Sequence, residues 1–126
     1  MNYSRQREQV LEYVKSVKTH PTAETVYNKV REKNSNISLG TVYRNLDKLS
    51  KEGKLLRIKM ANGKDRFDGY TSKHYHAICT KCDRVFDVSL DYFNNVDKVV
   101  AKNLNCNVLS HDIIFNIICP DCERGF

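Results

Sequence analysis

The sequence has no apolar run approaching the roughly 20 residues that a helix needs to cross a bilayer, which excludes a membrane-spanning helix. No targeting segment opens the chain, so we expect a cytoplasmic protein. The chain has five cysteines, an odd number, so they cannot all pair in disulfides. The fifth, Cys106, argues against a framework of disulfides. With 126 residues, the chain has room for one domain or two small ones.

The net charge of +6 is unevenly distributed along the chain. Residues 1–66 contain 15 Lys and Arg against 7 Asp and Glu, whereas residues 67–126 contain 6 against 8. A basic front half indicates a polyanionic partner, and the slightly acidic rear half indicates a different role. The alternative is a merely solvated basic surface, which charge counting does not separate from a binding surface.

Four cysteines form two Cys-x-x-Cys pairs, Cys79 with Cys82 and Cys119 with Cys122. Two close pairs of thiolates can surround a tetrahedral zinc ion, and four sulfur ligands leave no open position for catalysis. We therefore predict a structural Zn(II) site. The alternatives are two disulfides or a redox-active Cys-x-x-Cys.

The front half is predicted to begin with two helices. Apolar residues recur at helical spacing from Val10 to Val17. After a break, Thr22 is placed to cap a second helix that extends to Arg31.

A third helix is predicted after Ser38, which can serve as its cap, with Gly53 as its C-terminal stop. One face of this helix carries an apolar stripe made of Leu39, Val42, Leu46 and Leu49. The other faces carry candidate DNA contacts, namely Thr41, Tyr43, Arg44, Asn45 and Lys48. The alternative is an ordinary solvated helix, with Tyr43 half-buried in the core.

A two-stranded ribbon is predicted next. Residues 56–60 alternate apolar and basic, and Asn62-Gly63 predicts a hairpin turn before residues 65–68. Three helices and a ribbon are the order of a winged helix-turn-helix, in which Lys59 and Lys64 would flank the DNA groove. We therefore expect residues 1–68 to form a winged-helix domain that binds double-stranded DNA.

The rear half, residues 73–126, is predicted to be a small α/β domain behind a hinge at residues 69–72, which makes the chain α+β. Strand patterns cover residues 75–79, 84–88 and 113–118, and a helical pattern covers residues 90–102. Because the last strand is almost wholly apolar, we expect it to be buried in a homodimer interface. The alternative is that it packs only under its own helix.

A second set of metal ligands is predicted from histidines and aspartates. His74 and His76 alternate, so on a strand both rings point to one face, and Asp87 lies on the neighbouring strand. Asp68 ends the ribbon and His20 lies in the loop before the second helix. Nitrogen and oxygen donors suit Fe(II) or Mn(II) better than sulfur donors do. Metal bound by all five would set the relative orientation of the two halves.

Five motifs together resemble the Fur family of metal-dependent repressors, and most closely its peroxide-sensing branch, PerR. They are His20-Pro21-Thr22-Ala23, Ser38-Leu39-Gly40-Thr41-Val42-Tyr43-Arg44-Asn45-Leu46, Arg66-Phe67-Asp68, His74-Tyr75-His76-Ala77-Ile78-Cys79 and Cys119-Pro120-Asp121-Cys122. The resemblance implies an N-terminal winged helix, a C-terminal dimerisation domain, a four-cysteine zinc site and a regulatory metal site. By motif, the regulatory ligands are His20, Asp68, His74, His76 and Asp87.

The branch is indicated by Asp68 and Asp87, because iron-sensing relatives usually have Glu at both positions. Many relatives also have a further metal site, but here Lys73, Tyr75 and Asn94 stand where three of its ligands would be. Only His111 remains, so no third metal site is expected and His111 is interpreted as structural or solvated.

Resemblance to PerR implies a mechanism. Fe(II) in the regulatory site reduces hydrogen peroxide, oxygen is added to His20 or His74, metal is lost and DNA is released. The expected function is therefore a homodimeric, metal-dependent transcriptional repressor that senses peroxide, and neither an enzyme nor a binder of membranes or small organic substrates. The alternative within the family is a repressor that responds to iron, manganese or zinc without sensing peroxide.

Two features depart from the family pattern. Relatives usually begin with an extra helix, whereas this chain starts a few residues before its first core helix, which predicts either weaker DNA binding or compensation by other basic residues. Arg44 follows the iron-sensing pattern, where familiar PerR-like sequences have Asn. Outside the family, the alternatives are a non-haem iron oxygenase using two His and a carboxylate, and a zinc-stapled interaction module without DNA binding.

Overall fold

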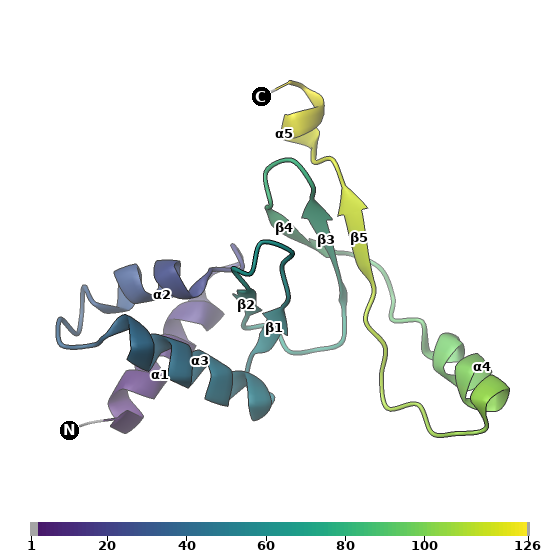
Figure 1. The fold of residues 1–126 in the computed structure, drawn as a ribbon, viewed down its shortest axis with the longest axis horizontal. Helices are drawn as coiled ribbons and strands as arrows, with labels where there is room; N and C mark the ends of the chain where they lie inside the picture. Colours follow the sequence, from purple (N-terminus) through teal and green to yellow (C-terminus); the bar gives the residue numbers. More distant parts are fainter. Residues whose placement is uncertain (1–2, 126) are drawn as a thin grey trace. The chain divides into compact units, whose positions relative to one another are not determined.

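The computed structural model describes residues 3–125, which divide into two compact units, one ending at Ser72 and one starting at Lys73. The first unit contains α1 (Tyr3–Ser16), α2 (Ala23–Val30), α3 (Leu39–Lys51), β1 (Leu56–Ile58) and β2 (Arg66–Asp68) (Figure 1). The second contains β3 (Tyr75–Cys79), β4 (Val85–Val88), α4 (Asn94–Leu104), β5 (Ile114–Ile117) and α5 (Pro120–Glu123). None of the described helices is long and apolar enough to span a membrane.

The start signals of α2 and α3 act as predicted. Thr22 Oγ1 accepts a hydrogen bond from the backbone N–H of Thr25 at 3.3 Å, and Ser38 Oγ accepts one from the N–H of Thr41 at 3.1 Å. Each cap thereby satisfies an N–H group that the first helical turn leaves without a partner. The predicted caps are confirmed.

The end of α3 is also confirmed. Gly53 adopts a left-handed φ of 76°, a conformation that costs glycine little. This geometry lets the N–H of Lys54 reach the carbonyl of Leu49 at 2.9 Å and the N–H of Gly53 reach that of Ser50 at 3.1 Å. The pair of bonds is a Schellman motif, which uses carbonyls that a helix end would otherwise leave unsatisfied.

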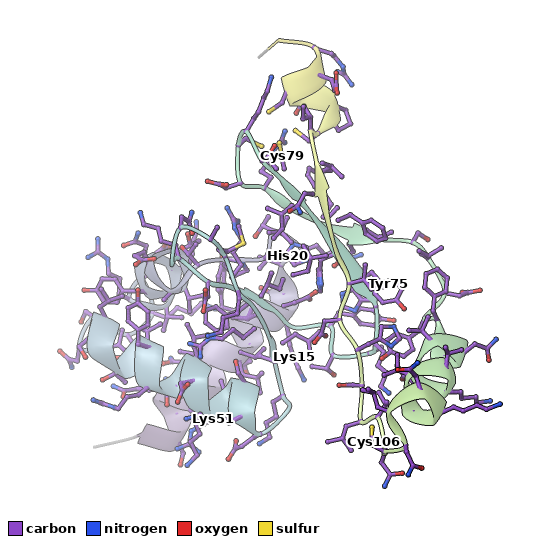
Figure 2. All side chains as sticks on the ribbon, turned by 45° about the vertical axis from the view of Figure 1, so that its right-hand side comes forward. Lys15, His20, Lys51, Tyr75, Cys79 and Cys106 are labelled. Carbon is purple, nitrogen blue, oxygen red and sulfur yellow. The ribbon has the colours of Figure 1, made fainter. Side chains whose placement is uncertain are left out.

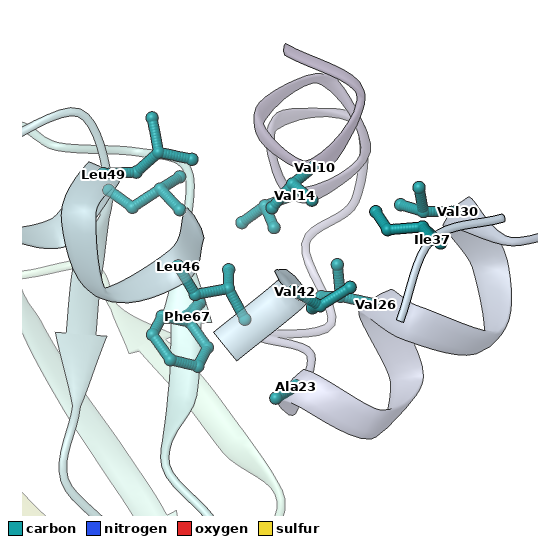
Figure 3. Packing of buried hydrophobic residues seen from close by; sticks show 11 residues of the cluster. Val10, Val14, Ala23, Val26, Val30, Ile37, Val42, Leu46, Leu49 and Phe67 are labelled. Atoms are coloured by element: carbon teal, nitrogen blue, oxygen red, sulfur yellow. The ribbon is translucent and has the colours of Figure 1, made fainter. Parts of the chain in front are cut away.

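The core of the first unit lies between its three helices and β2. Val42, Leu46 and Leu49 are buried there as predicted, and the close view shows them with side chains of α1 and α2 (Figure 3). Leu39 is 37% exposed, so its place in the buried stripe was predicted wrongly. It is the first residue of α3 and lies at the edge of the contact.

Asn45 corrects another expectation. It is 8% exposed, so it lies on the buried face of α3 and not on the outer face as predicted. The reason is helical spacing: Asn45 follows Val42 by three residues and precedes Leu49 by four, which puts all three on one face.

The ribbon of the first unit is shorter than predicted. β1 and β2 pair antiparallel, with Arg57 opposite Phe67. β1 ends at Ile58, and the N–H of Met60 bonds the side-chain Oδ1 of Asp65 at 3.1 Å in place of a ladder partner. Residues 59–65 therefore form a loop, on which Lys59 and Lys64 are exposed.

Gly69 packs unusually closely against the last turn of α1. A Cβ atom at this position would lie 2.7 Å from the Cα of Lys15 and 3.0 Å from its backbone nitrogen. Real Cβ atoms do not approach backbone so closely, so a larger side chain must push the segment away from α1. Glycine is required here by space and not by a positive φ.

Gly69→Ala is therefore expected to destabilise the first unit by about 1–3 kcal/mol, the range typical of overpacking. Gly40→Ala is the matched control, because its Cβ would meet no closer atom than Ser38 Oγ at 3.9 Å and it lies in α3. There, alanine is expected to be neutral or stabilising by up to about 1 kcal/mol. Urea unfolding followed by far-UV circular dichroism measures both, and equal stability of the two variants would contradict the close approach.

The second unit is built on a three-stranded sheet in the order β4-β3-β5. β3 pairs antiparallel with β4 and parallel with β5, and His76 lies opposite Asp87. In the described part of the chain β5 has only β3 as a neighbour, so it is an edge strand. Its apolar Ile114 and Phe115 are about two-fifths exposed.

α4 begins later than predicted, at Asn94 and not near Leu90. The N–H of Phe93 donates to the hydroxyl of Tyr75 at 2.8 Å, which holds the chain against β3 just before the helix starts. α4 lies at the opposite end of this unit from α5 (Figure 1). Within the described residues, none of the α4 side chains is buried, and four of its apolar ones are exposed, namely Val96, Val99, Val100 and Leu104.

Candidate metal centres and the exposed face of α3

The four cysteines of the two predicted pairs converge in the second unit. The Sγ atoms of Cys79 and Cys122 are 3.7 Å apart, and those of Cys82 and Cys119 are 3.8 Å apart. Tetrahedral zinc with Zn–S bonds of about 2.3 Å places its sulfurs about 3.8 Å from one another, whereas a disulfide needs about 2.05 Å. All four sulfurs lie within 4.8 Å of one another, so the cluster fits a structural Zn(II) ion. The disulfide alternative does not fit these distances.

Two tight turns present these sulfurs. After Cys79 at the end of β3, Asp83 adopts a left-handed φ of 63° and its N–H bonds the Cys79 carbonyl at 2.9 Å. After β5, Cys119 is the N-cap of α5, and Pro120 occupies the first helical turn, where its missing N–H costs nothing. Each Cys-x-x-Cys pair therefore wraps one edge of the cluster.

Hydrogen bonds tune the thiols in different directions. Mainly because the backbone N–H of Cys119 donates to Cys79 Sγ at 3.4 Å, the pKa of the Cys79 thiol falls to about 6. Hydrogen bonding with the Cys119 side chain raises the pKa of the Cys122 thiol to about 12. Because zinc binds cysteine as thiolate, its binding to all four sulfurs would displace the protons that they carry.

A histidine and aspartate set lies elsewhere in the second unit. His74 Nε2 and His76 Nε2 are 3.1 Å and 3.3 Å from the same oxygen of Asp87, and the two ring centroids are 4.4 Å apart. The predicted alternation and cross-strand position are thus confirmed. Both histidines therefore lie beside one carboxylate, and imidazole nitrogen with carboxylate oxygen is the donor chemistry that suits Fe(II) or Mn(II).

The first unit holds a smaller set. His20 Nε2 lies 3.3 Å from Asp68 Oδ2, and both side chains are buried. The loop carrying His20 is held against β2, because Arg66 donates to the His20 carbonyl at 3.1 Å and the N–H of Phe67 donates to the Pro21 carbonyl at 3.0 Å. His20 also has a left-handed φ of 54°, a strained conformation for a non-glycine residue that often marks a functional position.

The outer face of α3 presents exposed polar and charged side chains. Tyr43, Arg44 and Lys48 are exposed, and Thr41 is half-buried. The Tyr43 hydroxyl donates to Glu24 Oε1 at 2.7 Å, a bond that lowers the pKa of Glu24 and raises that of Tyr43. Arg44 donates to Thr41 Oγ1 at 3.1 Å. Protein contacts therefore hold Tyr43, Arg44 and Thr41 in place, and Tyr43, at 44% exposure, is not part of the core.

Known proteins share this architecture. A model described as the ferric uptake regulator family matches residues 1–123. The chain belongs to this family. As a member of the ferric uptake regulator family, it is a metal-responsive regulator, in agreement with the four-cysteine cluster and the His and Asp donors, which fit Zn(II) and Fe(II) or Mn(II) respectively.

Curated relatives in the family include regulators of the peroxide response. The peroxide operon regulator of Bacillus subtilis is 32% identical over 119 residues, which cover 94% of this chain and 82% of the relative. The peroxide-responsive repressor PerR of Staphylococcus aureus is 30% identical over 118 residues, which cover 94% of this chain and 80% of the relative.

Solved structures of family members have the same fold. The Campylobacter jejuni peroxide stress regulator matches with a TM-score of 0.81 at 28% identity, covering 96% of this chain and 91% of that protein. The Helicobacter pylori ferric uptake regulator Fur, described as having three functional metal binding sites, also gives a TM-score of 0.81, at 27% identity over 94% of this chain and 80% of that protein.

This family member holds His111 by hydrogen bonds on both ring nitrogens. Tyr75 Oη lies 2.5 Å from Nε2, and Asp97 Oδ1 lies 2.6 Å from Nδ1. Tyr75 lies in β3 and is almost fully buried, and Asp97 lies in the first turn of α4. Through His111, these side chains therefore connect α4 to β3. His111 is therefore structural, in line with its interpretation from sequence, and the absence of a third metal site stays a prediction.

Three hydrogen-bond partners of residues singled out in the sequence were not predicted. Asp97 and Glu24 are far along the chain from His111 and Tyr43, so no local spacing indicates either contact. Arg84 bonds two of the cysteine sulfurs. A signal for Arg84 was present, because it is a cation directly after a Cys-x-x-Cys turn.

Proposed function

We propose that the protein is a homodimeric, metal-dependent repressor that binds double-stranded DNA and senses hydrogen peroxide through oxidation of its own histidine ligands. The observation that carries this proposal is that each of the two units brings histidine nitrogen and an Asp oxygen together, at distances of 3.1 to 3.3 Å. Support also comes from the relatives named as peroxide regulators at 30% and 32% identity.

The regulatory ion is proposed to be Fe(II) or Mn(II), bound jointly by His20, Asp68, His74, His76 and Asp87. Three imidazoles and two carboxylates have the donor chemistry of these ions, and the two negative charges match a divalent cation. Because the donors belong to different units, binding would fix the orientation of one unit relative to the other. DNA binding would then depend on the metal, as ligand-controlled switches require.

Residues 1–68 are proposed to act as a winged helix with α3 as the reading helix. Arg44 is suited to pair with guanine, Tyr43 and Thr41 to meet thymine methyl groups or phosphates, and Lys48 to neutralise the backbone. The exposed Lys59 and Lys64 on the loop between β1 and β2 would contact the flanking DNA. Asn45 is left out of this set because it is buried.

Residues 73–126 are proposed to form the dimerisation domain, with residues 69–72 as the hinge. β5 is an edge strand whose backbone groups are available to a second chain, and its side chains are apolar and exposed. α4 adds further exposed apolar side chains. Apolar surface of this extent is typical of an interface, and a second copy would cover it.

Peroxide sensing is proposed to act on His20 and His74. Fe(II) held by His20, Asp68, His74, His76 and Asp87 would supply the electrons that reduce hydrogen peroxide beside these ligands. Oxygen added to a carbon of either imidazole removes its ability to bind metal. Oxidation of His20 would remove the one histidine donor of the first unit, and oxidation of His74 would remove one of the two in the second. The orientation needed for DNA binding would then be lost.

The test compares Fe(II)-loaded and Mn(II)-loaded protein treated with low peroxide, because Mn(II) should support DNA binding without this oxidation. Only the Fe(II) form is expected to release operator DNA, and its peptides with His20 or His74 should gain about 16 Da per added oxygen. Intact DNA binding by the Fe(II) form, with no mass gain, would contradict peroxide sensing. That result favours the sibling function, a repressor responding to iron, manganese or zinc, to which the likeness to Helicobacter pylori Fur also points.

A further inference from the structure

Arg84 occupies a position against the zinc-site sulfurs that none of the roles described above explains. Its Nε donates to Cys82 Sγ at 3.3 Å, and one terminal nitrogen donates to Cys119 Sγ at 3.0 Å. The same nitrogen is 2.9 Å from Asp121 Oδ2. One side chain therefore bonds a sulfur from each Cys-x-x-Cys pair, a geometry that the planar guanidinium fork allows.

The sulfurs in this cluster differ in access. Cys79 and Cys119 are fully buried, whereas Cys82 is exposed. Cys82 is thus the most exposed of the four cysteines, and its sulfur is one to which Arg84 donates, through Nε. The guanidinium also lies over the Phe86 ring, 5.6 Å from its centroid, which restricts its movement.

The charge of the site gives this contact a chemical consequence. Four thiolates and one Zn(II) ion carry a net charge of −2, and thiolate sulfur is the nucleophile in cysteine oxidation. A cation that donates hydrogen bonds to two of the sulfurs holds their lone pairs and lowers their nucleophilicity.

We propose that Arg84 is a positioning residue that protects the zinc-bound sulfur of Cys82 from attack by hydrogen peroxide, and that its bond to the buried Cys119 sulfur holds the guanidinium in place. In the reaction that it slows, a sulfur lone pair attacks one peroxide oxygen, the O–O bond breaks and hydroxide leaves. The thiolate becomes a sulfenic acid, the sulfur is oxidised by two electrons and the peroxide is reduced. The zinc ion loses a thiolate ligand and is released. The proposal rests on the zinc site alone and does not require peroxide sensing at the His and Asp donors.

The experiment uses zinc-loaded, iron-free full-length protein and follows zinc release with a chromogenic zinc indicator at several peroxide concentrations. Arg84→Gln is expected to raise the second-order rate constant of peroxide-driven zinc release on the order of tenfold. This factor is what the loss of one charge-assisted hydrogen bond to sulfur corresponds to when its free energy is converted into a rate. Arg84→Lys should be intermediate, because it keeps the charge but has a single nitrogen to donate. The matched control is Arg124→Gln, since Arg124 pairs with the same Asp121 at 3.7 Å, and its rate should not change. Iodoacetamide in place of peroxide should give the same ranking.

A purely structural role for Arg84 is separated by a second measurement, the rate at which a chelator removes zinc without any electrophile. Protection requires that Arg84→Gln accelerates the peroxide reaction more than it accelerates chelation. Equal acceleration of both, or a peroxide rate equal to that of the Arg124→Gln control, overturns the proposal. If Arg84→Gln does not retain zinc, Arg84→Lys decides by the same comparison. Because iron and DNA are absent, the outcome is independent of the proposed repressor function.

Discussion

Cys119→Ser is expected to abolish zinc binding and to unfold the second unit while the first unit stays folded. Cys119 is fully buried in the four-sulfur cluster, and serine offers oxygen in place of thiolate. The free energy of a structural zinc site can reach about 10 kcal/mol, which is comparable with the whole stability of a domain, about 5–15 kcal/mol. A small unit has little else to replace it.

The packing of the two units explains why only one should unfold. The first unit has its own core, in which Val10, Val26, Leu46 and Phe67 are buried between helices and β2. In the described part of the second unit, the buried apolar side chains are few: Tyr75, Ala77, Cys79, Val85 and Cys119. Zinc is therefore expected to supply much of the second unit's stability.

Zinc content and limited proteolysis measure the effect, with cleavage confined to residues from 73 onward. The matched control is Cys106→Ser, because Cys106 is exposed on the loop after α4, far along this unit from Cys79 (Figure 2). The control should keep its zinc and its protease resistance. Full zinc occupancy in Cys119→Ser would show that the four-sulfur site is not the metal centre.

Arg44→Ala combined with Lys48→Ala is expected to weaken operator binding on the order of a hundredfold at moderate salt. An arginine that pairs with guanine contributes about 1–3 kcal/mol, and a lysine on a phosphate contributes a further salt-dependent amount. Both side chains are exposed on α3, so their removal leaves the core intact. Zinc and Mn(II) binding should be unchanged.

Fluorescence anisotropy with labelled operator over a salt series separates the two contributions. The magnitude of the slope of log K against log salt should fall by about one for each lost phosphate contact. Loss of Arg44 should in addition lower the discrimination between operator and random DNA. The control is Lys98→Ala combined with Lys102→Ala on α4, which removes the same charge from the second unit. If both double variants lose affinity equally, the effect is one of net charge and α3 is not the reading helix.

Local signals predicted the parts of this protein that depend on neighbouring residues. Thr22 and Ser38 cap α2 and α3 because capping needs only a side chain and an N–H group three residues later. The convergence of Cys79 and Cys119 was predictable for a related reason, since two Cys-x-x-Cys turns have few other chemical uses.

One error came from a local signal that was misread. Asn45 looked like an outward-facing polar residue, but its spacing from Val42 and Leu49 places it on the buried face. The start of α4 was predicted too early, because the bond between Phe93 and Tyr75 that holds the preceding chain has no local signature. For Arg84 the sequence offers a cation just after a Cys-x-x-Cys turn, but its bond to Cys119 exists only because the two turns meet.

By itself, the sequence determined the order of the first four helices and of the strands, the four cysteines that fit zinc and the identity of the candidate regulatory donors, but it did not predict α5. These follow from periodicity, capping and the chemistry of Cys, His and Asp at short spacing. Only the tertiary structure decided that one oxygen of Asp87 lies beside both His74 and His76, and that Arg84 donates hydrogen bonds to sulfurs of both Cys-x-x-Cys pairs. Such contacts join residues from different strands and turns, and their distances are set by packing and strand register, which no local pattern encodes.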